Sequence, residues 1–125
     1  MADKWQAQQT LWESFDLPAY DETTVPDDAV MPYITYEAVA GNMGAATTTA
    51  VNLWYRSNSW AEISRKAQQI AMYIDNMVSS VKIDGGRMKV RLPDNMAWGT
   101  RMEEPSDGGV RRIRLAFEIE FLTQN

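Results

Sequence analysis

The sequence predicts an α+β fold: a mainly antiparallel sheet with one long amphipathic helix, at about residues 59–79, and a short N-terminal helix packed on it. Three observations favour this class. Apolar and charged residues alternate over 110–122, and apolar residues recur every three or four positions over 60–77. Short turns separate the other strand-like runs, which favours antiparallel neighbours and the element order α-β-β-α-β-β-β-β.

Length and composition predict a single domain spanning residues 1–125, with 45% hydrophobic residues to build a core. The chain has no cysteine and no histidine, which excludes disulfides, thiolate nucleophiles, histidine bases and zinc sites built on these residues. The net charge of −5 argues against a general nucleic-acid binder, which needs a basic field. The first residues precede no long apolar run, so we expect neither a signal peptide nor a membrane span.

The first helix is expected over residues 3–15, with Asp3 as its N-cap and Leu17–Pro18 as its end. Residues 19–31 are acidic and contain proline, so the sequence predicts an irregular connection there.

Two strands are expected next, over residues 32–39 and 47–55, because both segments are rich in β-branched and aromatic residues. The small residues between them, 40–46, predict a hairpin loop that is mobile in the isolated protein and becomes ordered on assembly. The candidate mobile loop is centred on Gly41, Asn42, Met43 and Gly44.

The main helix is predicted from Ser59 to Val78, and Ser59 followed by Glu62 has the spacing of a capping box. We expect its apolar stripe to pack on the inner face of the last strand. The stripe consists of Trp60, Ile63, Ala67, Ile70, Ile74 and Met77.

Four further strands are expected after this helix, at 81–83, 87–92, 96–103 and 110–122. Glycines at 85–86 supply the positive φ that a tight hairpin turn requires.

The last strand is the most informative segment, because its odd positions from 113 to 121 are apolar and most of its even positions are charged. One face must therefore be core and the other wet. The wet face is sorted by sign, with Arg112 and Arg114 in its first half and Glu118 and Glu120 in its second. Such a stripe suits contact with copies of the same chain; a solvated sheet face is the alternative.

A second group of basic residues, Arg87, Lys89 and Arg91, can join the arginines at 111–114 in one patch if their strands are neighbours. The patch would contact an acidic partner; alternatively its charges face water and pair with Glu118 or Glu120. The candidate oligomer interface is Arg87, Lys89, Arg91, Arg112, Arg114, Glu118 and Glu120.

No catalytic residue, metal site or cofactor site is expected. Sequential Glu103 and Glu104 cannot share a strand face, and the face of Glu118 and Glu120 should be too wet to raise a carboxylate pKa. The acidic residues over 21–28 lack the spacing of an EF-hand, and no glycine-rich segment has the spacing of a phosphate cradle.

Five tryptophans are many for this length. Trp54, Trp60 and Trp98 are expected in the core, whereas Trp5 and Trp12 lie on a short helix that docks on the sheet or forms an interface.

Five segments together carry a family resemblance through their order and spacing: 32–37, 53–60, 101–105, 110–113 and 118–125. The chain from about residue 12 to residue 125 resembles the tail-completion or tail-terminator proteins of long-tailed bacteriophages and prophages. The acidic stretch 21–28 is only loosely matched, and no role is carried onto it.

The resemblance implies an antiparallel sheet with packed helices, and a ring, usually of six copies, that caps the finished tail tube. The implied partners are the chain itself, the major tail protein and the head-connector proteins, with no membrane and no specific nucleic-acid binding. It implies a structural, non-enzymatic virion protein assembled in the cytoplasm of a bacterial host. A head-completion or neck protein of the same gene module is the near alternative.

Two other classes stay open: a small enzyme that uses the carboxylates, and a monomeric binding module with a ligand groove. An enzymatic activity that is lost when Glu118 or Glu120 is changed would favour the small enzyme. A protein that stays monomeric and binds one ligand saturably would favour the binding module. For the ring, the sequence predicts that the basic hairpin of one copy meets Glu118 and Glu120 of the next.

Overall fold

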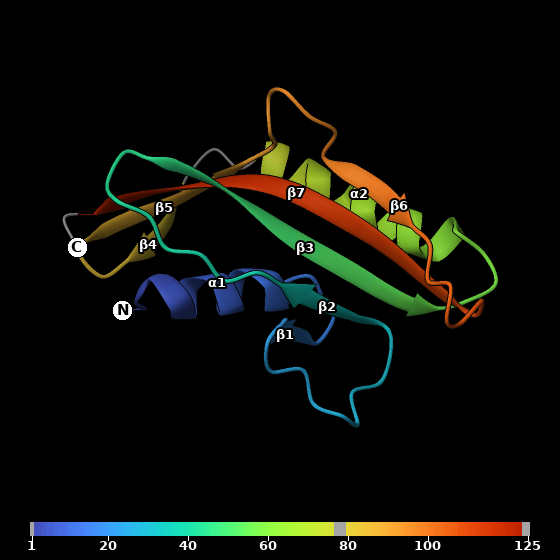
Figure 1. The fold of residues 1–125 in the computed structure, drawn as a ribbon. Coiled ribbons are helices and arrows are strands. Elements are labelled where there is room, and N and C mark those ends of the chain that lie inside the picture. Colours follow the sequence, from blue (N-terminus) through green and yellow to red (C-terminus); the bar gives the residue numbers. More distant parts are fainter. Residues whose placement is uncertain (1, 77–79, 124–125) are drawn as a thin grey trace.

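The computed structural model describes residues 2–76 and 80–123, and Figure 1 shows their fold. The predicted α+β class is confirmed: in the described residues, two helices lie against a curled, mostly antiparallel sheet of seven strands. The elements are α1 (Lys4–Glu13), β1 (Ala19–Asp21), β2 (Tyr33–Tyr36), β3 (Ala46–Arg56), α2 (Ala61–Asp75), β4 (Val81–Ile83), β5 (Gly86–Arg91), β6 (Gly99–Met102) and β7 (Val110–Thr123).

The strands follow the order β1-β2-β3-β7-β5-β4, and β6 pairs with β7 beside this path. The long central pair runs from Ala46 opposite Glu120 to Arg56 opposite Val110. Every pair is antiparallel except β1 with β2. Strands distant in sequence therefore meet on the two sides of β7, which forms the spine of the sheet (Figure 1).

Strand β1 corrects the prediction of an irregular connection over 19–31. Its three residues are too few to show a period, and its neighbour β2 holds them in place. The Ile34 amide donates to the Pro18 carbonyl at 2.8 Å, and the Glu22 amide donates to the Tyr36 carbonyl at 2.9 Å. The expected element order therefore lacked one strand.

The alternation of β7 is confirmed on its inner face, where all five odd positions from 113 to 121 are buried. Its outer face is drier than predicted: the four charged side chains there are half-buried and Ala116 is buried. Long charged side chains cover one another and their stems, which explains the partial burial.

Helix α2 begins later and is shorter than predicted, and position 77 of the stripe lies outside the described residues. The capping box was wrong. Trp60 is the N-cap and makes no side-chain capping bond, while the Ser59 hydroxyl accepts from the Ala61 amide at 3.0 Å. Four residues of the stripe, Ile63, Ala67, Ile70 and Ile74, are confirmed as core, whereas Trp60 is only partly buried.

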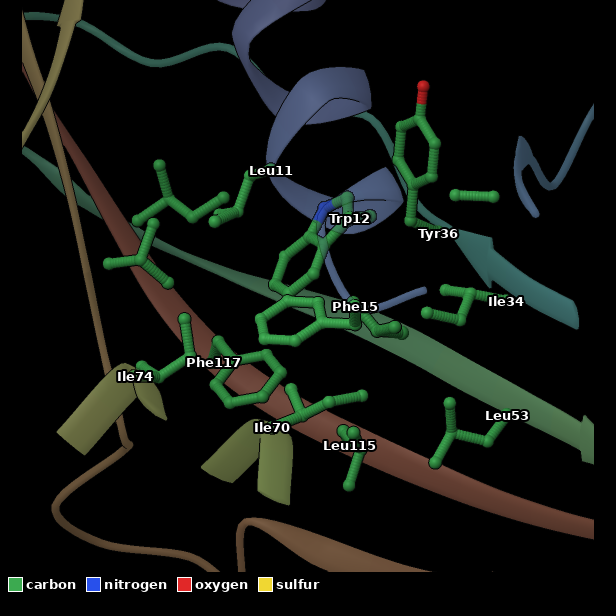
Figure 2. Packing of buried hydrophobic residues seen from close by; sticks show 14 of the residues in the cluster. Leu11, Trp12, Phe15, Ile34, Tyr36, Leu53, Ile70, Ile74, Leu115 and Phe117 are labelled. Atoms are coloured by element: carbon green, nitrogen blue, oxygen red, sulfur yellow. The ribbon is translucent and has the colours of Figure 1, made fainter. Parts of the chain in front are cut away.

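Helix α1 is packed on the sheet as predicted, with Asp3 as its N-cap in a capping box with Gln6. Figure 2 shows Trp12 of α1 and Phe15, two residues after the end of that helix, meeting Phe117, beside Ile70 and Ile74 of α2. The two helices thus share one face of the sheet. Neither helix in the described residues is long and apolar enough to span a membrane.

The expected burial of Trp54, Trp60 and Trp98 in the core was wrong, whereas docking of the first helix on the sheet, one of the two alternatives for the tryptophans of that helix, is found for Trp12. Trp54, Trp60 and Trp98 are only partly buried, whereas Trp12 is fully buried and stacks on Phe117 with ring centroids 5.4 Å apart. Trp54 lies on the face of β3 opposite the helices, Trp60 is the N-cap of α2 and Trp98 precedes β6, so all three lie at the margin of the core, and the short helix supplies the central tryptophan.

Two adjacent glutamines fasten α1 to the sheet. The buried Gln8 amide accepts from the Val39 amide at 3.0 Å and donates to the Val39 carbonyl at 2.7 Å. Gln9 donates to the Ala19 carbonyl of β1 at 2.8 Å and accepts from the Tyr36 hydroxyl.

At the other end of α1, the Ala2 carbonyl accepts from the Asp84 amide at 2.7 Å. Helix α1 therefore lies between the two edge strands and contacts both.

Replacing Gln8 with methionine is expected to lower the free energy of unfolding by about 1–3 kcal/mol, because it leaves the main-chain groups of Val39 without their partner. Chemical denaturation measures this. The matched control is Gln68→Met on the exposed part of α2, which should change stability by less than about 0.5 kcal/mol. Equal effects of the two changes would contradict the docking role of Gln8.

Candidate assembly surface

The predicted interface residues lie on the sheet face opposite the helices, which we call the open face. The register of β5 with β7 sets Lys89 opposite Glu120 and Arg91 opposite Glu118. Because Met88 and Val90 are buried between them, Arg87, Lys89 and Arg91 project to the open face.

Arg91 bridges the acidic half of β7 within the same chain. Its Nε lies 3.0 Å from Glu118 Oε2, and its Nη1 lies 3.1 Å from Glu120 Oε1. The hydrogen bond to Glu120, reinforced by Glu118, raises the pKa of the Arg91 guanidinium. Pairing with Glu118 and Glu120, the alternative that the sequence left open, is thus found for Arg91; contact of this face with a second copy stays a prediction.

The basic residues do not form the single patch considered from the sequence. Antiparallel pairing brings β5 against the acidic half of β7, so Arg112 and Arg114 lie away from it, opposite β3 and β6. Arg112 Nε lies 2.9 Å from Glu104 Oε1, and its guanidinium lies 5.0 Å from the centre of the Trp54 ring. The interface residues are therefore divided into two groups along β7.

A row of aromatic side chains continues the Arg112 group across the open face. Trp54, Tyr33 and Tyr20 lie on three successive strands, with neighbouring ring centroids 6.3 and 5.7 Å apart. Trp54 Nε1 donates to Thr35 Oγ1 at 2.8 Å. Sequence reasoning missed this row, because only the register shows that Tyr33 lies opposite Trp54.

The candidate mobile loop joins β2 to β3 at the end of β7. The Gly44 amide donates to the Phe121 carbonyl at 3.2 Å, and Lys4 Nζ donates to the Gly41 carbonyl at 3.1 Å. Gly44 has φ of +79°, a conformation that favours glycine, and Met43 is 60% exposed. Mobility of this loop and its ordering on assembly stay predictions.

Three of the acidic residues weighed as catalytic or metal-binding candidates are engaged in ion pairs. Glu104 pairs with Arg112, and Glu118 and Glu120 pair with Arg91. Within residues 2–76 and 80–123, no three acidic side chains group as a metal would require.

No protein-family model matches the chain, and no curated protein matches it. Among solved structures, it is similar to a chain from the virion of a native gene transfer agent (GTA) particle. The TM-score is 0.59 at 17% sequence identity, and the match covers 93% of this chain and 87% of that one. At this identity the likeness shows a shared fold.

Proposed function

We propose that this chain is a structural protein of a phage-like virion, and that it completes the tail tube and joins it to the head connector. The observation that carries the proposal is the fold shared with a chain of a gene transfer agent virion over nearly the full length of both. The sequence resemblance to tail-completion proteins supports the more specific role.

In this proposal, copies of the chain form a closed ring between the major tail protein and the head connector. The ring size that we test first is six copies. A ring of one kind of subunit needs two different patches that fit each other. The open face supports this, because its charged groups and its aromatic row are unlike one another and lie at separate places. The role needs no catalytic residue or cofactor, and the protein would be assembled in the host cytoplasm and found in the virion.

Deletion of the gene from the phage or prophage that encodes it tests the role. We expect electron microscopy to show filled heads without tails and free tails of irregular, extended length. Expression of the chain from a plasmid should restore joined particles. Mass photometry of the purified protein should show an assembly of six times the chain mass of 14.2 kDa, alone or on isolated tail tubes.

Two results would change the proposal. Free tails of normal length would assign the chain to the neck or to head completion instead of tail termination. Normal, infectious particles after deletion would contradict a virion role altogether.

A further inference from the structure

We propose that a pocket beside α1 receives a lysine side chain from the β4–β5 hairpin of a second copy of this chain. The acceptor pocket has a volume of about 460 Å³ and is bordered by Trp5, Tyr36, Asp21, Glu22 and Glu37. The donor surface is Lys82 and Lys89. The inference rests on the proposed ring and names the two patches that would close it.

The acceptor pocket combines an aromatic wall with carboxylates that have no cationic partner among the described residues. Trp5 is 53% exposed, although it belongs to a helix whose other face is buried. Asp21, Glu22 and Glu37 form no ion pair within the described part of the chain. An alkylammonium group suits such a site, because its cation is attracted to both a carboxylate and an indole ring.

Asp21 is held in the charged form. Its Oδ1 accepts from the Thr23 amide at 2.9 Å and from the Thr23 hydroxyl at 2.7 Å. The bond from the Thr23 amide is the main reason that the pKa of Asp21 lies below its ordinary value. The pocket therefore presents a preoriented carboxylate at neutral pH.

The donor surface has the opposite character. On the β4–β5 hairpin, Arg87 is engaged with Ser80, and Arg91 with Glu118 and Glu120. The exposed Lys82 and Lys89 form no ion pair among the described residues. Because Arg91 already occupies the acidic half of β7, these two lysines fit a different anion.

The positions of the two surfaces fit a head-to-tail contact. The pocket lies beside β1 and the lysines lie on β4 and β5, at opposite ends of the strand order, with α1 between β1 and β4 (Figure 1). A contact between two different patches of identical chains is heterologous and can close into a ring. Charge pairing would set the register, and burial of Trp5 would add affinity.

Two one-sided charge reversals test the contact. The pocket variant carries Glu22→Lys and Glu37→Lys, which spare the hydrogen bonds between Asp21 and Thr23, and the hairpin variant carries Lys82→Glu and Lys89→Glu. Each alone has two surfaces of like charge, so we expect at least tenfold weaker self-association by sedimentation, with unchanged circular dichroism. An equal mixture should assemble again, because the pocket of each variant then fits the hairpin of the other.

The matched control is Arg65→Glu with Gln69→Glu on the exposed face of α2, which should assemble like the unchanged protein. Trp5→Ala should weaken association without changing the fold. If the unchanged protein assembles only on tail tubes, co-expression of the two reversed variants in the deletion strain gives the same readout as joined particles.

Self-association of either reversed variant at the unchanged strength, or no recovery in the mixture, would overturn the inference. So would zero-length carbodiimide cross-links in assembled particles that join the pocket to another virion protein and never to Lys82 or Lys89. The two proposals can fail separately. If only the contact is wrong, deletion of the gene still gives the expected tail defect. If only the virion role is wrong, the mixture of the two reversed variants still regains self-association in solution.

Discussion

Replacing Ile70 with aspartate is expected to lower the free energy of unfolding by about 4 kcal/mol or more. Ile70 is fully buried where α2 meets the sheet, near Phe117 and Ile74 (Figure 2). The change removes apolar contacts and also places a carboxylate inside a cluster of buried hydrophobic side chains. Denaturant unfolding followed by circular dichroism measures the loss.

The pH dependence of this variant supplies an internal check. Burial would raise the pKa of the new carboxyl in the folded protein above its value in the unfolded chain. The folded state then binds more protons, so the deficit relative to the unchanged protein should shrink as pH falls from 7 to 5. Gln69→Asp, one position along on the exposed face, should show neither the large loss nor this trend. Near-normal stability of the Ile70 variant would contradict the assignment of the stripe to the core.

Periodicity was a reliable guide where an element was long and had one buried face. The alternation over β7 and the three-to-four spacing over α2 each predicted the residues that are buried. It failed at β1, whose three residues depend on the pairing with β2. The capping box failed because α2 starts one residue later than the Ser59 spacing required.

The polar side of α1 hid its packing from the sequence. Gln8 is buried among apolar residues because its amide satisfies both main-chain groups of Val39, 31 positions away. No local pattern in the sequence shows such a partner. The sequence therefore predicted a helix that is only partly apolar, and it did not predict that Trp12 lies at the centre of the core.

The candidate surface was identified only as a set of residues, and the grouping within it depends on strand order. Strand β5 pairs with β7, so its cations face Glu118 and Glu120 instead of extending the arginines at 112 and 114. The sequence could not place Lys82, which has no ion pair in the part of the chain that the structure describes, or the acceptor pocket, because both depend on where the two edges of the sheet lie around α1. The sign of each charged residue follows from the sequence, but the register between neighbouring strands decides which of these residues pair.

Replacing Trp12 with alanine is expected to lower the free energy of unfolding by about 3–5 kcal/mol. Trp12 has no exposed surface and stacks on both Phe117 and Phe15, with ring centroids 5.4 and 6.3 Å apart. It is the contact through which α1 reaches the centre of the sheet, so its loss leaves a large cavity in the shared core. The measurement is the midpoint and slope of a urea unfolding curve.

Trp5→Ala is the matched control, because it removes the same side chain from the same helix at an exposed position. It should change the free energy of unfolding by less than about 0.5 kcal/mol. The two variants therefore separate two uses of tryptophan in one ten-residue helix: Trp12 fastens α1 to the fold, and Trp5 is available for a neighbouring copy. Equal stability losses would show that α1 is not anchored through Trp12, and weaker assembly in the Trp12 variant alone would move the proposed contact away from the acceptor pocket.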